Sequence, residues 1–365
     1  MNGFALFRLP YQQTCTWLEG PVQEFLSCAE LNGQSGFVVA PFQVATDQPI
    51  LLIHPEESQQ LSTEKPAFWT DEPFCLHLST TDRQVLRNDS DQGISANRSY
   101  YHIDFANFHA QLQSGEFQKI VLARCSEEPK ADDVSPFELF QRACQNYPRL
   151  FIALVFTPQS GLWLTATPEI LLEGQGHTWK TIALAGTMKL TEEEAQQDVP
   201  AVSWSIKNIQ EQRFVATYIT ECLEQFTNDF SEEGPYTARA ANLVHLRSDF
   251  HFTLDSNERI GNLLATLHPT PAVCGLPKRQ TYQFITRNEH TPRRYYSGFM
   301  GMLQPAGDTH LYVSLRCMEI GPSAYRLYAG GGLLKDSVEE QEWQETEAKL
   351  ETMRRCIATR KTSTF

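Results

Sequence analysis

Residues 150–172 read LFIALVFTPQSGLWLTATPEILL, and this stretch decides the expected fold. Two apolar runs flank the turn Pro158-Gln159-Ser160-Gly161, a pattern typical of a β-hairpin that leads into a third strand at 168–172. The strands of a hairpin pair antiparallel. Because such strands interleave with helical stretches along the chain, we predict an α+β fold with mostly antiparallel sheets.

Upstream of the hairpin, the segment FQKIVLARC at 117–125 alternates in the way a strand does. The alternation places the following residues on one face: Phe117, Lys119, Val121, Ala123 and Cys125. The amine of Lys119 would then lie among apolar neighbours. A helix is predicted to begin at Pro136, with Ser135 as its N-cap and Glu138 completing a capping box.

The first hundred residues alternate short apolar runs with polar turns and contain no chemical motif. We interpret residues 1–100 as an N-terminal scaffold part of the same fold, and residues 101–365 as the region that carries the chemistry. The polar run 88–99 is the expected flexible connection between them.

Downstream, a strand is expected to end at 183–187, and a long helix to begin near Ala201. The loop HPTPAVCG at 268–275 should be rigid, and LYVSLRCMEI at 311–320 should form one strand. Three glycines, Gly330 to Gly332, precede a final helix that is predicted over 338–357.

Composition narrows the classes of partner. The 365 residues carry 44 acids and 30 Lys or Arg, a formal charge of −14, and no extended basic run, which argues against nucleic acid. An anionic substrate would need local cations or a metal to offset this field. Nine cysteines without a CxxC pair, no signal peptide and no long apolar stretch indicate a cytoplasmic protein without a disulfide framework or membrane segment.

Glu211 is the first candidate for chemistry, because it falls on the broad apolar face of the helix expected after Ala201. A carboxylate that faces an apolar interior needs a cation or several hydrogen-bond donors. A structural alternative is a core-edge glutamate that pairs with Arg213 or Lys207.

On the last helix, Glu342, Glu345 and Lys349 are spaced i, i+3 and i+7, so they share one stripe. Two carboxylates there could hold a divalent ion, and the ammonium could hold a substrate carboxylate. The alternative is a solvated acidic face. The triplet Gly330–Gly332 permits backbone N–H groups to converge on an anion, although a simple turn would use the same residues.

Three further side chains have unusual positions. Arg316 interrupts an apolar strand, where it could grip a substrate carboxylate or form a structural salt bridge. Burial of Lys119 would lower its pKa toward values at which the neutral amine can act as a base. Burial of Glu169 would have the opposite effect and keep a proton on its carboxyl.

Several segments, in this order, resemble the chorismate-utilising family of isochorismate, salicylate, anthranilate and aminodeoxychorismate synthases. They are FQKIVLAR, ATPEILL, ALAGT, LHPTPAVCGLP, YSGFMG, SLRCMEI and AGGGLLKDSVEEQEWQETEAKL, within residues 100–357. The resemblance implies two large antiparallel sheets packed together with helices outside. It also implies that chorismate is the small-molecule substrate. Because the sequence has no obvious segment that would dock a partner, we expect no obligatory protein partner.

The resemblance further implies a role for each matching residue. Lys119 would activate water and Glu169 would protonate the departing 4-hydroxyl, while Glu211, Glu345 and Glu342 would hold Mg²⁺. The chorismate pocket would be lined by Gly186, Thr187, His245, Ser248, Ala272, Val273, Tyr296, Arg316, Gly330, Gly331, Gly332 and Lys349.

Two positions favour the water-adding branch of the family. Lys119 stands where the anthranilate type typically has glutamine, and Ala185 stands where the aminodeoxychorismate type has lysine. The expected reaction is therefore Mg²⁺-dependent conversion of chorismate to isochorismate. A salicylate synthase, which goes on to eliminate pyruvate, and a non-catalytic chorismate-binding subunit remain alternatives, and a menaquinone or a siderophore pathway could use the product.

The sequence also departs from the family pattern. Where the family commonly shows KDxxEH around its metal glutamate, this chain has KNIQEQ at 207–212. Asn208 and Gln212 thus replace the acid and the histidine that would support a metal ligand. Arg247 adds a positive charge to which the resemblance gives no role.

Overall fold

The computed structural model describes residues 2–63, 98–130, 134–189, 202–240 and 243–358. Its strands form two large antiparallel sheets joined by one long strand, β2 (Thr14–Phe25), which takes part in both. Because of β2, hydrogen bonds link all 17 described strands into one network. The α+β class predicted from the hairpin is confirmed. The expected pair of sheets is present, and the two sheets share strand β2.

The first sheet contains the quoted hairpin, whose strands pair from Phe151 opposite Thr167 to Thr157 opposite Gly161. Its order is β5 (Glu57–Ser62), β2, β1 (Asn2–Arg8), β7 (Phe151–Thr157), β8 (Gly161–Thr167), β16 (Cys317–Ile320), β17 (Ala324–Leu333), β6 (Lys119–Pro129) and β13 (Gly275–Leu276).

The second sheet begins again at β2 and carries the strand pair that later frames the site, β10 and β12. Its order is β2, β4 (Ile50–Ile53), β3 (Gly36–Ala40), β14 (Phe299–Leu303), β15 (Thr309–Val313), β9 (Ile170–Gln175), β10 (Thr178–Lys189), β12 (Leu243–Thr253) and β11 (Phe230–Ala240).

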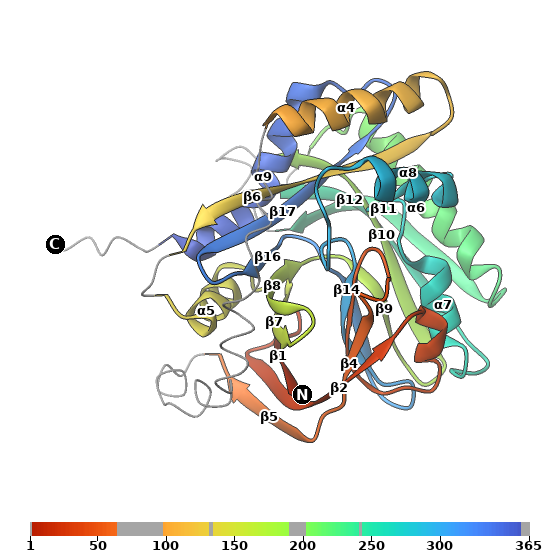
Figure 1. The fold of residues 1–365 in the computed structure, drawn as a ribbon. Coiled ribbons are helices and arrows are strands. Elements are labelled where there is room, and N and C mark those ends of the chain that lie inside the picture. The colour runs from red at the N-terminus through yellow and green to blue at the C-terminus, as the bar shows by residue number, and fades with distance from the viewer. Residues whose placement is uncertain (1, 64–97, 131–133, 190–201, 241–242, 359–365) are drawn as a thin grey trace.

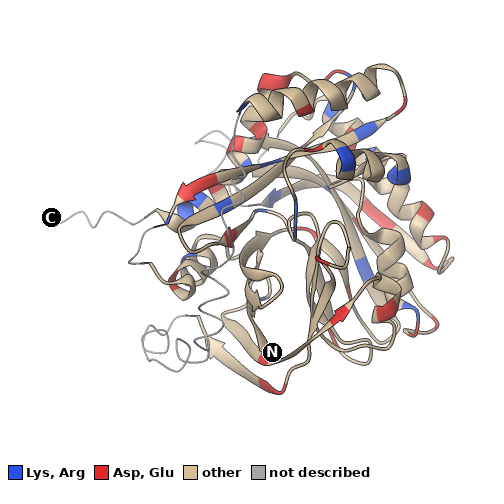
Figure 2. Cartoon of the chain, viewed as in Figure 1, with Lys and Arg blue, Asp and Glu red and all other residues tan. Residues whose placement is uncertain are grey.

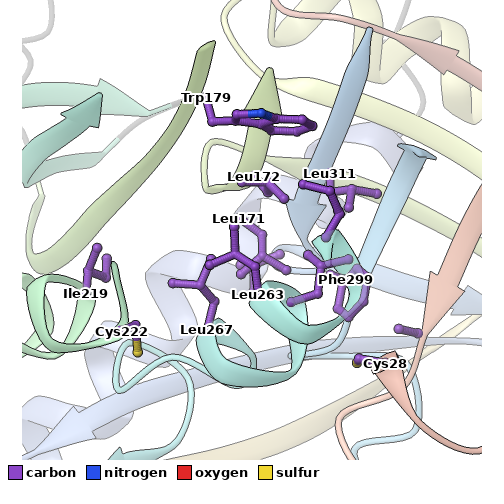
Figure 3. Close-up of a cluster of buried hydrophobic side chains, with 14 of the residues drawn as sticks. Cys28, Leu171, Leu172, Trp179, Ile219, Cys222, Leu263, Leu267, Phe299 and Leu311 are labelled. Atoms are coloured by element: carbon purple, nitrogen blue, oxygen red, sulfur yellow. The ribbon is translucent and has the colours of Figure 1, made fainter. Parts of the chain in front are cut away.

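Helices cover the outer faces of the two sheets (Figure 1). A core rich in aromatic side chains lies between the sheets. The helical segments are a 3₁₀ turn (Cys28–Leu31), α4 (Arg98–Gln113), α5 (Pro136–Asn146), α6 (Ile206–Leu223), α7 (Ile260–Leu267), α8 (Lys278–Asn288) and α9 (Glu339–Ile357). Helices α6 and α7 pack on the second sheet, where Leu263 and Leu267 lie against Leu171 and Phe299 (Figure 3). Helices α5 and α9 pack on the first sheet, and α4 and α8 cover its β6 end.

Sequence patterns within a few residues predicted most of these elements. The hydroxyl of Ser135 caps α5 by accepting a hydrogen bond from the Glu138 backbone N–H, as predicted, but the Glu138 side chain pairs with Arg142 instead of closing a capping box. Helix α6 begins at Ile206, with Ser205 as its cap, which is later than the predicted start near Ala201; Ala201 lies outside the described residues.

Three sequence expectations differ from the structure. Phe117 precedes β6, so it packs with Ile120 and Leu122 and not on the Lys119 face. The expected strand 311–320 is two strands, β15 and β16, separated by a break that contains Arg316. Helix α4 was not predicted, and the part of the 88–99 run that the structure describes, Arg98 and Ser99, forms its first turn.

The signal for α4 was present in the sequence. Its buried residues Tyr101, Phe105, Phe108 and Leu112 recur at i, i+4, i+7 and i+11, which is helical spacing. The remainder of the polar run, 88–97, lies outside the described residues, as does the stretch on which the N-terminal boundary near residue 100 depends. That boundary stays a prediction.

Acidic and basic residues are interspersed along the ribbon in the view of Figure 2, and acids are frequent on helix α9. The eight cysteines within the described ranges are all unpaired and buried. Among the residues that the structure describes, no helix is both long and apolar enough to cross a membrane.

Candidate active site

A pocket opens where β6 and β17 of the first sheet face β10 and β12 of the second, with α6 and α9 beside it. It is lined by Val121, Pro168, Glu169, Leu184, Ala185, Gly186, Thr187, Glu211, His245, Ala272, Val273, Tyr296, Leu315, Arg316, Tyr328, Ala329, Gly330, Gly332 and Lys349. The free space at its centre is about 60 Å³. This is small for a ring-sized ligand, so lining side chains must move when one enters.

Lys119 and Glu211 form a buried ion pair beside this pocket. The Lys119 side chain is fully buried, and its Nζ lies 2.9 Å from Glu211 Oε1. Burial alone would raise the pKa of Glu211, but the Lys119 ammonium outweighs it and lowers that pKa. The cation that this carboxylate required is therefore Lys119, not Arg213 or Lys207, which pair with Glu232 and Glu342.

Glu169 lies between β8 and β9 and is almost completely buried. Burial raises the pKa of its carboxyl to about 8, although the nearby charges of Lys119 and Lys349 act in the opposite direction. The same site thus contains an amine and a carboxyl group that keeps its proton at neutral pH, which is an arrangement suited to acid–base chemistry.

His245 and Arg316 form a second buried pair in the wall. Burial and the Arg316 cation hold the pKa of His245 well below its ordinary value, so the ring is neutral. Its Nε2 accepts a hydrogen bond from Arg316 Nη2 at 2.5 Å, which leaves Nδ1–H to donate to the Gly186 carbonyl at 3.0 Å. Arg316 has a left-handed backbone (φ 47°) in the break between β15 and β16, and this break turns its guanidinium into the pocket.

The three candidate metal ligands surround the backbone of Gly331 and Gly332. A Cβ on Gly331 would lie 3.4 Å from Glu342 Oε2 and 3.9 Å from Glu345 Oε1, and one on Gly332 would lie 2.1 Å from Glu211 Oε1. Glu342 is paired with Lys207, and Glu345 with Lys349 at 2.8 Å. The acidic stripe of α9 is therefore not simply a solvated face, since Glu342 is buried.

The oxygens of these carboxylates are suitable ligands for Mg²⁺, because hard cations prefer oxygen ligands. The Oε2 atom of Glu342 is also buried and accepts no hydrogen bond from any described residue, so it has a lone pair to offer. As the described residues stand, no three His, Cys, Asp or Glu side chains are grouped closely enough to share one ion. Each of the three glutamates instead pairs with a lysine.

Most residues expected in the chorismate pocket do line it. The exceptions are Ser248, which is buried and accepts a hydrogen bond from Gln212 Nε2 at 3.3 Å, and Gly331, whose open side faces α9. The pocket lining also includes residues that were not predicted to line it: Val121, Pro168, Leu184, Ala185, Leu315, Tyr328 and Ala329. Their apolar character is common to core residues, so the sequence held no signal that separates them.

The two departures from the family pattern have defined positions. Gln212 is buried and donates from Nε2 to the Ala183 carbonyl and to Ser248, so it ties α6 to β10 and β12. Asn208 lies against Gly186, where a Cβ would come within 3.1 Å of the Asn208 Cβ. Gly186 also has a φ of +67° at the bulge in β10. The positive φ and the close approach of Asn208 both require glycine at this position.

This arrangement of two antiparallel sheets with helices outside is shared with solved isochorismate and anthranilate synthases. The family model described as "chorismate binding enzyme" matches residues 48–358. The chain belongs to this family.

Relatives agree with this assignment. Isochorismate synthase DhbC from Bacillus subtilis (strain 168) is 28% identical, over 93% of this chain and 85% of that protein. Isochorismate synthase EntC from Escherichia coli (strain K12) is 25% identical, over 92% of this chain and 86% of that protein.

Solved structures show the same fold. A putative 2,3-dihydroxybenzoate-specific isochorismate synthase from Bacillus anthracis superposes with a TM-score of 0.77 at 21% identity, covering 96% of this chain and 95% of that one. Anthranilate synthase component I from Streptococcus pneumoniae gives 0.65 at 17% identity, over 92% and 80% of the two chains.

Proposed function

We propose that this chain is a Mg²⁺-dependent isochorismate synthase, which adds water at C2 of chorismate with loss of the C4 hydroxyl. The proposal is supported by family membership and by relatives that are named isochorismate synthases. The observation that carries it is that Lys119 pairs with the lining residue Glu211, close enough to Glu169 in the same lining for its charge to act on the raised pKa of that carboxyl.

Each charged group at the pocket has a place in this reaction. Glu169 holds a proton at neutral pH and donates it to the departing hydroxyl. Lys119 directs water onto C2 and accepts the proton that the water loses. In the structure its ammonium pairs with Glu211, so Lys119 has to lose a proton, and the glutamate has to move aside, before water reaches the amine. Arg316 and Lys349, both in the lining, offer cations to the two carboxylates of the substrate.

Mg²⁺ held by Glu211, Glu345 and Glu342 would add positive charge beside the bound dianion. Such charge is needed because the chain as a whole carries −14. The lysines that now pair with these glutamates would share that task and orient the side chains.

The product spectrum tests this function directly. With chorismate and Mg²⁺, the purified protein should give isochorismate as the accumulating product, and excess EDTA should abolish turnover until Mg²⁺ is returned. Chromatography separates the alternatives. Salicylate with an equal amount of pyruvate would assign a salicylate synthase, and tight binding of chorismate without any product would assign a non-catalytic subunit.

Gly332→Ala is expected to lower kcat/KM for chorismate by at least about tenfold, because the added Cβ would lie 2.1 Å from Glu211 Oε1 and 3.0 Å from Lys119 Cε. The ion pair must shift to admit it. Steady-state kinetics measures the loss, and Gly307→Ala is the control, since the nearest atom to its Cβ would be 3.5 Å away. Equal activity of the two variants would contradict the placement of Lys119 and Glu211 in the machinery.

A further inference from the structure

Strand β6, which carries Lys119, has two edges that are built differently. On one edge it pairs with β17 over ten residues of that strand. On the other edge β13 supplies two residues, Gly275 opposite Ile120 and Leu276 opposite Lys119. The backbone groups of β6 that lie beyond β13 need other partners, because this part of the strand is buried.

Two charged side chains supply those partners. The Val121 carbonyl accepts a hydrogen bond from Arg293 Nη2 at 2.8 Å, and the Ala123 N–H donates to Glu289 Oε1 at 2.7 Å. Glu289 is the residue that caps the C-terminus of α8, and Arg293 follows four positions later. Beside Val121 and Ala123, this segment therefore takes the place of a neighbouring strand.

Glu289 and Arg293 also bind each other. Arg293 Nε lies 2.6 Å from Glu289 Oε2, and Nη2 lies 2.7 Å from Oε1, so the contact is bidentate. The side chains of Arg293 and Glu289 are 3% and 2% exposed. Such a buried pair is costly to desolvate, and it keeps a defined geometry when further hydrogen bonds satisfy its other donors and acceptors.

The same guanidinium reaches the loop that precedes β13. Arg293 Nη1 donates to the Val273 carbonyl at 2.7 Å. Val121 and Val273 both line the active pocket, which is the one that Glu169 lines. Tyr296 lines it too, and its backbone N–H donates to the Arg293 carbonyl at 2.9 Å. One arginine thus bonds the main-chain carbonyls of two pocket residues and holds β6 against this loop.

The pair can influence the chemistry through the backbone alone. Neither Glu289 nor Arg293 is among the described residues that line the active pocket, so neither would touch the substrate. Lys119, however, lies two residues before Val121 on β6. A shift of β6 along the loop would therefore move the Lys119 amine relative to Glu169, which lies between β8 and β9.

The backbone around Lys119 leaves little room for such a shift. Gly332 lies opposite Val121 in the pairing with β17, and an added Cβ on Gly332 would lie 3.0 Å from Lys119 Cε. Catalytic groups lose much of their effect when they are displaced by about 1 Å. The register of β6 is consequently a property on which the rate of the reaction depends.

We propose that Glu289 and Arg293 are positioning residues, which together replace a strand at the edge of β6 and hold Lys119 in place relative to Glu169. The role rests on the proposed function, but the hydrogen bonds do not. The substrate carboxylates are assigned to Arg316 and Lys349, in the break before β16 and on α9. Loss of the pair should therefore lower kcat and leave KM nearly unchanged.

Arg293→Lys is the first test. Lysine keeps the positive charge, but its three N–H donors sit on one atom and cannot span two carbonyls and a carboxylate as the planar guanidinium does. We expect kcat for chorismate to fall about tenfold or more, with KM within about threefold of the wild type. Steady-state kinetics on the full chain measures both constants.

Arg8→Lys is the matched control. Arg8 is also buried and donates to main-chain carbonyls, those of Tyr147 and Leu150 at 2.6 Å, but it is not among the described residues that line the active pocket. Urea denaturation should show a loss of stability in both variants, whereas Arg8→Lys should keep kcat within about twofold of the wild type. A pair that only stabilises the fold would give the two variants the same kcat, and this result would overturn the positioning role.

Glu289→Gln provides a second variant and a readout that does not need turnover. The amide can still accept a hydrogen bond, but it loses the charge that makes the contact with Arg293 bidentate and strong. We expect kcat to fall with KM nearly unchanged. Amide hydrogen exchange in a peptide that spans residues 119–125 should be faster in Glu289→Gln and Arg293→Lys than in Arg8→Lys. Equal exchange in all three variants would overturn the proposal.

The two proposals fail in different ways. If the wild type forms no isochorismate from chorismate, the proposed function is wrong, and the role of the pair in that reaction is wrong with it. If the wild type is active and both Arg293→Lys and Glu289→Gln match Arg8→Lys in kcat, only the positioning role is overturned.

Discussion

Lys119→Ala should lower kcat/KM for chorismate by roughly 10²- to 10⁴-fold, the range that a general base contributes. The fully buried Lys119 amine forms an ion pair with Glu211, and alanine offers nothing that could direct water onto C2. Removal of the cation would also leave the Glu211 carboxylate without its partner, at a cost of about 3–5 kcal/mol in unfolding free energy. Steady-state kinetics and urea denaturation measure the two effects.

Lys119→Arg separates chemistry from stability. The guanidinium keeps a positive charge near Glu211 but does not lose its proton in proteins, so it cannot act as a base. We expect this variant to be more stable than Lys119→Ala and equally inactive. Lys335→Ala, on the exposed side of the turn before α9, serves as the control. An arginine variant that works at near-wild-type rate would remove Lys119 from the role of base.

Glu169→Gln is the second substitution with a large expected effect. The amide has nearly the same shape as the protonated carboxyl but cannot transfer a proton to the leaving hydroxyl, so kcat should fall roughly 10²- to 10⁴-fold with little change in KM. Steady-state assays with chorismate would measure this fall in kcat. If kcat stayed within about threefold of the wild type, the acid would have to be another group.

The pH dependence of the same residue gives an independent measurement. Because the pKa of Glu169 is about 8, the proton-donating form is present below that pH and is lost above it. The value of kcat/KM should therefore fall about tenfold per pH unit on the alkaline side.

The free energy of unfolding should also depend on the ionisation of Glu169. The folded pKa of about 8 exceeds the ordinary value of 4.5, so the folded state binds more protons than the unfolded state between these two pH values. The contribution of Glu169 to stability is thus fully present below pH 4.5 and is lost as the pH rises through 8. Urea denaturation between pH 5 and 9 should show a shallower decline for Glu169→Gln, and parallel curves for variant and wild type would contradict the raised pKa.

Local patterns were sufficient for much of the fold. The turn at 158–161 between two apolar runs predicted the β7–β8 hairpin, and Ser135 with Pro136 predicted the start of α5, because these signals act over a few residues. Spaced motifs indicated the family, which the match over residues 48–358 confirmed. The roles assigned to Lys119, Glu169 and the glutamates stay predictions until kinetics tests them.

What only the tertiary structure decided is which charged groups meet. Glu211 pairs with Lys119, 92 positions away on β6, and Lys207 pairs with Glu342 of α9. The structural alternative considered for Glu211, a pair with Arg213 or Lys207 of its own helix, is not the one that forms. The left-handed backbone conformation of Arg316 and the position of a cavity that Arg247 lines likewise depend on how distant strands pair. The physical reason is that the strength of an ion pair and the pKa of a carboxyl such as Glu169 both depend on burial and on neighbouring charges. Sheet register brings those charges together from distant parts of the chain, and the local periodicity of the sequence contains no information about burial depth or about such neighbours.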